Sequence, residues 1–190
     1  MAYLSPVAPS RRLMPRLAAA LPLIGLMGMQ SACVTTPAPK SAASAALMDG
    51  QGSMRGSVTI TEGADITVQV RAMGLAPGLH AVHIHAVGRC DAPDFATAGP
   101  HWNPMGKSHG AENPNGPHLG DLPNMTIGSD GAGELTFSVP ARLDTGDHPL
   151  LDSDGAALVI HAGPDDMKTD PSGNSGGRIA CGVIMKNGVK

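Results

Sequence analysis

Alternating polar and apolar residues predict β-strands in the first half of the chain. Residues 55–61 place Val58 and Ile60 on one face and polar residues on the other, and residues 66–72 repeat the alternation. Strand side chains point to opposite faces with a period of two, so each run is typical of a half-buried strand. Residues 62–65, Glu-Gly-Ala-Asp, separate the two runs and predict an antiparallel hairpin.

Six further runs have the length and apolar content of short strands. They span residues 44–48, 79–85, 125–127, 134–139, 156–161 and 178–185. With the hairpin they make about eight strands, and no internal repeat or helical heptad is visible. The 25 glycines and 17 prolines supply the turns, and aromatic residues make up only 2% of the chain. We therefore expect an all-β domain with an aliphatic core.

Residues 89–124 form a long segment with little apolar periodicity. A loop of this length is unusual in a compact domain and needs cross-links that offset its ordering entropy. Cys90 offers one of them. A metal site offers another, since five of the chain's eight histidines fall between residues 83 and 121.

The histidines fall at spacings that suit metal ligands. His83 and His85 lie two apart in a predicted strand, so they point to the same face, as two ligands of one ion must. A solvated pair is the alternative. His80 points to the opposite face, and we do not expect it to be a ligand. His161 ends another predicted strand and is a further candidate ligand.

Four later residues have the composition of a zinc shell. They follow the spacing H-x7-H-x8-H-x2-D and are His101, His109, His118 and Asp121. Three imidazoles and one carboxylate fill a tetrahedral zinc shell and leave no open position, which is typical of a structural site.

The start of the chain is typical of an export signal. Three arginines precede an apolar run at residues 17–29, and small residues follow it. The run is shorter than the roughly 20 apolar residues that span a membrane. Pro22 and Gly25 disfavour the alternative, a buried helix. Residues 1–32 are therefore predicted as a signal peptide, with Met14 as an alternative start.

Residues 30–33, Gln-Ser-Ala-Cys, resemble a bacterial lipobox, in which Cys33 becomes the lipidated first residue. Gln30 departs from the apolar residue usual at its position. We expect a lipid anchor at Cys33, a flexible tether over residues 33–47 and a folded domain over residues 48–190. The expected location is the periplasm or cell envelope, with membrane contact only through this anchor.

Cysteine count and charge narrow the choice of compartment and partner. With Cys33 in the leader, Cys90 and Cys181 remain as a pair, which in an exported chain should form a disulfide; two buried free thiols are the alternative. After Cys33 the chain has 10 basic and 16 acidic residues, a formal charge of −6. Such a surface argues against a nucleic-acid partner.

Five stretches resemble the copper/zinc superoxide dismutases of the bacterial exported type, in family order and spacing. They are residues 78–85, 98–104, 118–124, 159–166 and 173–184. The resemblance implies an eight-stranded Greek-key β-barrel or sandwich with long metal-binding and electrostatic loops. It also implies an oxidoreductase that disproportionates superoxide to dioxygen and hydrogen peroxide by copper redox cycling. Zinc would then have a structural role and would tune the acidity of His101.

The resemblance assigns each candidate ligand to a metal. The copper ligands would be His83, His85, His101 and His161. The zinc ligands would be His101, His109, His118 and Asp121. His101 would therefore bridge copper and zinc. The pair Cys90 and Cys181 would be the family disulfide.

The resemblance also implies roles outside the ligand sets. Arg178 would lie beside the copper as an anion-binding catalytic residue, together with His101. Asp165 would link His83 to His109. The loop at residues 166–177 is short, and Lys168 is its nearest basic candidate for guiding substrate.

Two other functions are alternatives to superoxide dismutation. A non-enzymatic periplasmic copper- or zinc-binding protein would need neither a bridging histidine nor Arg178. A catalytically inactive family member would usually lack ligands, and here all seven are present. The expected partner is the superoxide anion, and the sequence leaves both a monomer and a homodimer open.

Overall fold

The computed structural model describes residues 41–188, and within them almost all regular structure is β. The strands are β1 (Ser41–Met48), β2 (Met54–Glu62), β3 (Ile66–Ala72), β4 (Gly78–His80), β5 (Val82–His85), β6 (Met125–Ile127), β7 (Gly133–Val139), β8 (Ala157–His161), β9 (Arg178–Val183) and β10 (Met185–Lys186). One 3-10 turn, η1 (Ala96–Ala98), lies in the first long loop. No helix in this part of the chain is long and apolar enough to cross a membrane.

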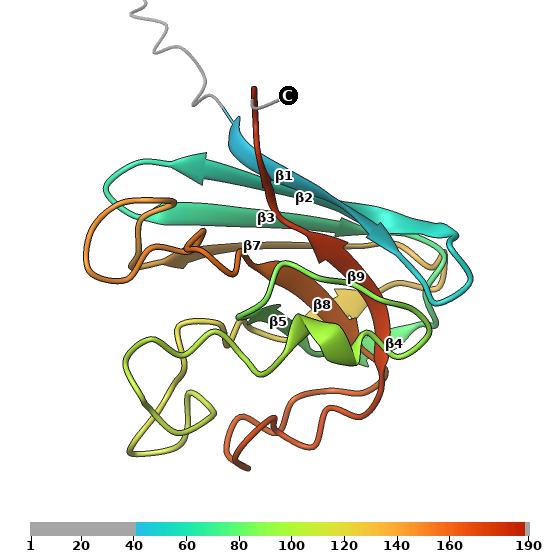
Figure 1. The fold of residues 1–190 in the computed structure, drawn as a ribbon. Coiled ribbons are helices and arrows are strands. Elements are labelled where there is room, and N and C mark those ends of the chain that lie inside the picture. Colours follow the sequence, from blue (N-terminus) through green and yellow to red (C-terminus); the bar gives the residue numbers. More distant parts are fainter. Residues whose placement is uncertain (1–40, 189–190) are drawn as a thin grey trace, which may run out of the picture. The chain divides into compact units, whose positions relative to one another are not determined.

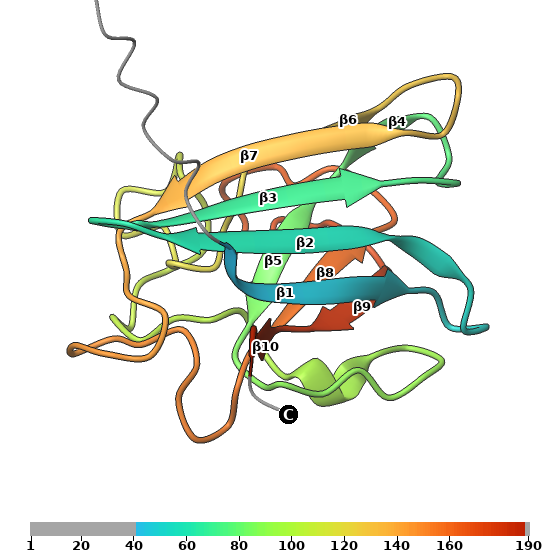
Figure 2. The same ribbon diagram turned by 90° about the horizontal axis from the view of Figure 1, so that it is seen from above.

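The strands form one large antiparallel sheet and one small pair. The large sheet has the order β5-β8-β9-β1-β2-β3-β7, with β10 beside β1, and β4 pairs with β6. The large sheet curls so that β1, β2, β3 and β7 form one layer above β5, β8 and β9 (Figures 1 and 2). This arrangement confirms the all-β fold of the barrel or sandwich type.

The predicted hairpin is present with the expected faces. β2 and β3 pair so that Val58 lies opposite Val70 and Ile60 lies opposite Val68. All four side chains are buried in the core between the two layers. Alternation along the sequence therefore fixes which face of this hairpin is buried, because a register shift of one residue would expose it.

Two predicted strands are each divided in the structure, so ten strands replace eight. Within residues 79–85, β4 pairs with β6 and β5 pairs with β8, because the chain passes from one sheet to the other at Ala81. Near the end, the Ile184 N–H donates to the Ala156 carbonyl, while Met185 pairs with Ser44 on β1. The first break changes the partner strand, whereas β9 and β10 both pair with β1.

The predicted strand at residues 44–48 begins earlier, at Ser41, so the predicted tether over residues 33–47 is wrong for residues 41–47, which belong to β1. Ala43, Ala45 and Leu47 are buried and alternate with more exposed residues. The alternation is weak in sequence because alanine and serine differ little in hydrophobicity. The signal peptide, Cys33 and the rest of the tether lie outside the described residues.

Candidate metal centre

Four histidines from β5, β8 and the first long loop converge in one cluster. His83 and His85 lie on β5, and His161 ends the neighbouring strand β8. His101 comes from the long loop and is held against His85 by an isolated antiparallel bridge. One ring nitrogen from each of the four lies within 4.8 Å of the others, and all four residues are buried. The long loops gather at this end of the domain (Figure 1).

Each of these rings presents one buried nitrogen that has no hydrogen-bond partner within residues 41–188. These nitrogens are His83 Nδ1, His85 Nε2, His101 Nε2 and His161 Nε2. A buried polar atom without a partner costs about 1–3 kcal/mol, so four together in one place do not suit a packed core. They do fit a cation that accepts four imidazole ligands, as copper does.

Three of these imidazoles, His85, His101 and His161, are held in the neutral form that binds metals. Burial, with the nearby charge of Arg178 as a smaller contribution, lowers the pKa of His85 to about 2 and that of His161 to about 3. Burial also lowers the pKa of His101 to about 4, although the hydrogen bond to Asp121 opposes this shift. Protons therefore compete weakly with a metal at these nitrogens.

A second cluster is built around one oxygen of Asp121. Its Oδ1 lies close to the Nδ1 atoms of three rings, at 2.9 Å from His101, 3.0 Å from His109 and 3.2 Å from His118. Burial raises the pKa of Asp121, but hydrogen bonds from His101 and His109 outweigh it and lower the pKa overall. An ionised carboxylate among three imidazoles is the donor set that zinc prefers.

The two clusters share His101. Its Nδ1 contacts Asp121, while its Nε2 is the partnerless nitrogen facing the first cluster. The clusters are so close that His83, whose ring centroid lies 4.0 Å from that of His101, falls within ligand distance of both. We assign His83 to the first cluster because Asp165 holds its other nitrogen, and His118 to the second because its Nδ1 contacts Asp121.

Asp165 joins the clusters from outside, with the two contacts that the resemblance implies. Its Oδ2 lies 2.8 Å from His83 Nε2, and its Oδ1 lies 2.9 Å from His109 Nε2. Asn124 holds the Asp165 backbone through reciprocal hydrogen bonds of 2.8 and 2.9 Å. At Gly173, with φ +62, a Cβ would lie 1.8 Å from Asp165 Oδ1, so no other residue fits there.

Arg178 is tied to the first cluster through main-chain oxygens. Its Nη1 donates to the Phe95 carbonyl at 2.6 Å, and its Nη2 donates to the Gly99 carbonyl at 2.8 Å. The same Gly99 oxygen lies 2.9 Å from His85 Nδ1. The guanidinium is therefore fixed beside a ligand of the first cluster.

The predicted disulfide is present. Cys90 and Cys181 are bonded and lie 91 residues apart in sequence. The bond ties the start of the long loop to β9, next to the strand end that carries Arg178.

The sequence of the chain also matches a known protein family. A family model described as "Copper/zinc superoxide dismutase (SODC)" matches residues 54–184. The chain belongs to the copper/zinc superoxide dismutase family. A Cu-Zn superoxide dismutase of Caulobacter vibrioides is 42% identical over 147 residues, which is 75% of this chain and 84% of that protein. The superoxide dismutase-like protein YojM of Bacillus subtilis is 41% identical, with 76% of each covered.

Solved structures of similar proteins agree with the fold. The crystal structure of a SOD-like protein from Bacillus subtilis has a TM-score of 0.71 at 38% identity and covers 75% of this chain and 97% of that one. The clock protein EA4 has a TM-score of 0.63 at 34% identity and covers 77% of this chain and 94% of that one.

Several groups that contact the candidate ligands were not found from the sequence. Gly99 acts through its carbonyl, which carries no sequence signature. Ser175 is buried, with its Oγ 3.1 Å from His161 Nδ1. Lys168, the expected guide for substrate, is paired with Glu112 at 2.8 Å, so its charge is largely neutralised. Asp170 also contacts the site through the His109 N–H, and its place in a polar loop gave no signal of this role.

Proposed function

We propose that this chain disproportionates superoxide to dioxygen and hydrogen peroxide and that it binds one copper and one zinc. The copper ligands in this proposal are His83, His85, His101 and His161. The zinc ligands are His101, His109, His118 and Asp121. The observation that carries the proposal is that His101 offers one ring nitrogen to each of two adjacent, buried ligand sets.

Bound copper supplies one-electron oxidation and reduction, and bound zinc supplies a fixed charge beside it. The chain supplies rigidity, since two ligands lie on β5 and one ends β8. Dismutation also consumes protons. His101 Nε2 is a buried ring nitrogen at which a proton can be held beside the substrate.

Arg178 supports an anionic substrate. A guanidinium keeps its charge at working pH and can hold an anion through paired donors. Its two hydrogen bonds to main-chain carbonyls fix its position beside His85. A local cation is needed, because the chain after Cys33 has a formal charge of −6 and repels anions at long range.

The alternative function is that of a non-enzymatic copper- or zinc-binding protein. A relative named superoxide dismutase-like protein and a similar structure named clock protein do not carry the name of an enzyme. The shared His101 and the fixed Arg178 favour the enzyme here. A carrier must release its ion, and neither group serves release.

Two variants test the proposal. His85→Ala should lose copper and the catalysed decay of superoxide while keeping zinc, because His85 contacts only the copper set. His118→Ala should lose zinc first. Metal content and stopped-flow superoxide decay measure both effects. Catalysis at the wild-type rate in a copper-free His85→Ala protein would overturn the proposal.

We further propose that the chain is exported and anchored by a lipid at Cys33. The charged, apolar and small-residue order before Cys33 supports this, as does a disulfide, which persists in oxidising compartments. A fatty-acid analogue should label the wild type and not Cys33→Ala. Equal labelling of both proteins, or of neither, would refute the anchor.

A further inference from the structure

The segment after β8 reaches the proposed zinc ligands with two carboxylates. Asp165 holds the ring of His109. Five residues later, Asp170 Oδ1 accepts the backbone N–H of His109 at 2.5 Å and lies 4.0 Å from His118 Nε2. Asp170 therefore contacts one zinc ligand and faces the outer nitrogen of another.

The outer nitrogen of His118 needs an acceptor. His118 is buried, and its Nδ1 is the atom beside Asp121 Oδ1. When Nδ1 binds a metal, the ring proton sits on Nε2. Metal-bound imidazoles almost always donate this proton to a carboxylate, a carbonyl or water. Within residues 41–188, Asp170 is the only carboxylate within 4.0 Å of that nitrogen.

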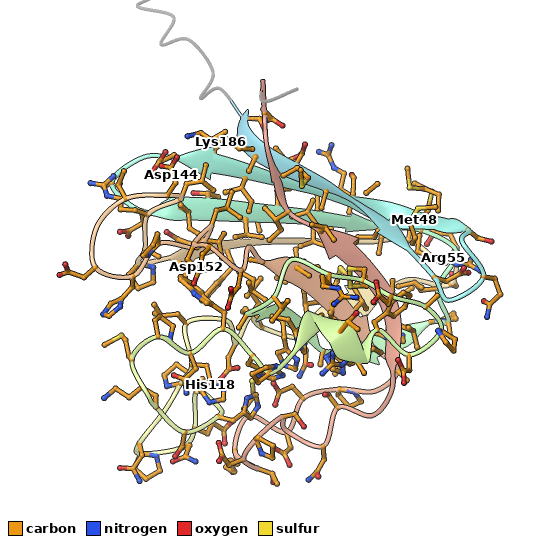
Figure 3. The ribbon with its side chains drawn as sticks, viewed as in Figure 1. Met48, Arg55, His118, Asp144, Asp152 and Lys186 are labelled. Carbon is orange, nitrogen blue, oxygen red and sulfur yellow. A yellow bond between two sulfur atoms is a disulfide. The ribbon has the colours of Figure 1, made fainter. Side chains whose placement is uncertain are left out.

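A cavity brings solvent to this side of the zinc ligands. It has a volume of about 480 Å³, and His101, His118, Lys107, Asp152 and Asp170 are among the residues that line it. Figure 3 labels His118 in the loops and Asp152 in a separate segment that lines the same cavity. Zinc that leaves its ligands, or a chelator that approaches them, can use this cavity.

The position of Asp170 is fixed by contacts between its segment and the loop that carries His109. The Glu112 N–H donates to the Met167 carbonyl at 2.9 Å, and Asn113 Nδ2 donates to the Lys168 carbonyl at 3.2 Å. The ion pair between Lys168 and Glu112 adds a third contact. The Asp170 carboxylate is therefore held at the edge of the zinc ligands although its side chain is 57% exposed.

We propose that Asp170 is a positioning residue for zinc: when zinc is bound, its carboxylate closes the 4.0 Å separation from His118 Nε2, accepts that N–H and slows zinc loss through the cavity. The inference rests on the zinc ligands of the proposed function. Asp165 and Asp170 then serve the two zinc histidines that copper does not share, one carboxylate for each ring.

The test follows zinc release from the copper- and zinc-loaded full chain into the chromophoric chelator 4-(2-pyridylazo)resorcinol. Asp170→Ala should release zinc about 10–100-fold faster than the wild type and keep its copper. Asp152→Asn is the matched control, because Asp152 lines the same cavity without contacting a ligand, and it should behave as the wild type.

Asp170→Asn separates positioning of His118 from simple loop anchoring. The same Oδ1 faces the His109 N–H and His118 Nε2, so asparagine keeps a neutral acceptor and the shape of the loop. It loses only the charge, which strengthens a hydrogen bond from the ring N–H of a metal-bound imidazole. Faster zinc release from Asp170→Asn supports the proposal, also where Asp170→Ala fails to load zinc. Wild-type release from Asp170→Asn overturns it and leaves a purely structural role. Zinc retained in His118→Ala would instead show that the zinc assignment itself is wrong.

Discussion

Asp165→Asn should weaken the binding of copper and spare zinc. Asp165 Oδ1 accepts from both the Met167 backbone N–H, at 2.6 Å, and His109. An asparagine will therefore keep its oxygen at this position, since two donors face it. The NH2 of the asparagine side chain then takes the place of Oδ2 and points its donor hydrogens at His83 Nε2.

The magnitude follows from the single hydrogen bond that is lost. A hydrogen bond to a charged group contributes about 1.5–3 kcal/mol, so copper should bind about 10–150-fold more weakly. The change also favours the wrong tautomer of His83, because a ring that accepts at Nε2 carries its proton on Nδ1. That nitrogen is the one that faces the copper site.

Competition with graded chelator concentrations, followed by elemental analysis, measures both affinities. Asp165→Ala should weaken copper and zinc together, since it removes both oxygens. Asp130→Asn, an exposed change in a distant turn, controls for the loss of charge. Loss of zinc with copper retained in Asp165→Asn would refute the reasoning.

Three further predictions concern substrate attraction, stability and pH. Arg178→Ala should keep both metals but slow dismutation at least about tenfold at low salt, and its rate should respond less to added salt than the wild-type rate. Cys181→Ser should lower the free energy of unfolding, measured with urea, by about 4–5 kcal/mol, because the disulfide closes a loop of 91 residues. The third prediction concerns chelator-treated protein. As pH is lowered below 6.5, the unfolded chain protonates His85 and His161, but the folded protein does not protonate them until their pKa values of about 2 and 3. Each histidine should therefore lower the free energy of unfolding by about 1.4 kcal/mol per pH unit. Stability should also fall above pH 6.5, through His109. Burial lowers the pKa of His109, but hydrogen bonds that its ring donates to Asp121 and Asp165 outweigh burial and raise the pKa to about 9, so its contribution to stability is lost as pH rises to that value.

A specific result would contradict each of these three predictions. Full activity in metal-replete Arg178→Ala would give this arginine a structural role only. Unchanged stability in Cys181→Ser would mean that the unfolded chain is already restricted without the disulfide. Stability of the chelated protein that rises on acidification from pH 6.5 to 5 would show that His85 and His161 are not held neutral.

Much of the site could be predicted because strand periodicity is short and strict. Two histidines separated by one residue must share a face, and β5 holds His83 and His85 in this way. The cysteine pair followed from counting. The β2–β3 hairpin followed from alternation, and its buried face is the predicted one.

Features that depend on distant partners escaped the sequence. The break at Ala81 exists because β4 and β5 pair with different strands, and no local signal marks such a change. The roles of Gly99 and Asp170 depend on loop geometry. A carbonyl oxygen carries no sequence pattern, and an exposed aspartate in a polar loop resembles any other until the fold places it beside His118.

Metal content and superoxide decay, measured on the same preparation of the full chain, test the central claim most directly. We predict one copper and one zinc per chain and a rate of superoxide loss that scales with the copper content. Removal of copper should abolish catalysis, and its return should restore it. A protein loaded with both metals that does not accelerate superoxide decay would contradict the account, as would catalysis that survives complete removal of copper.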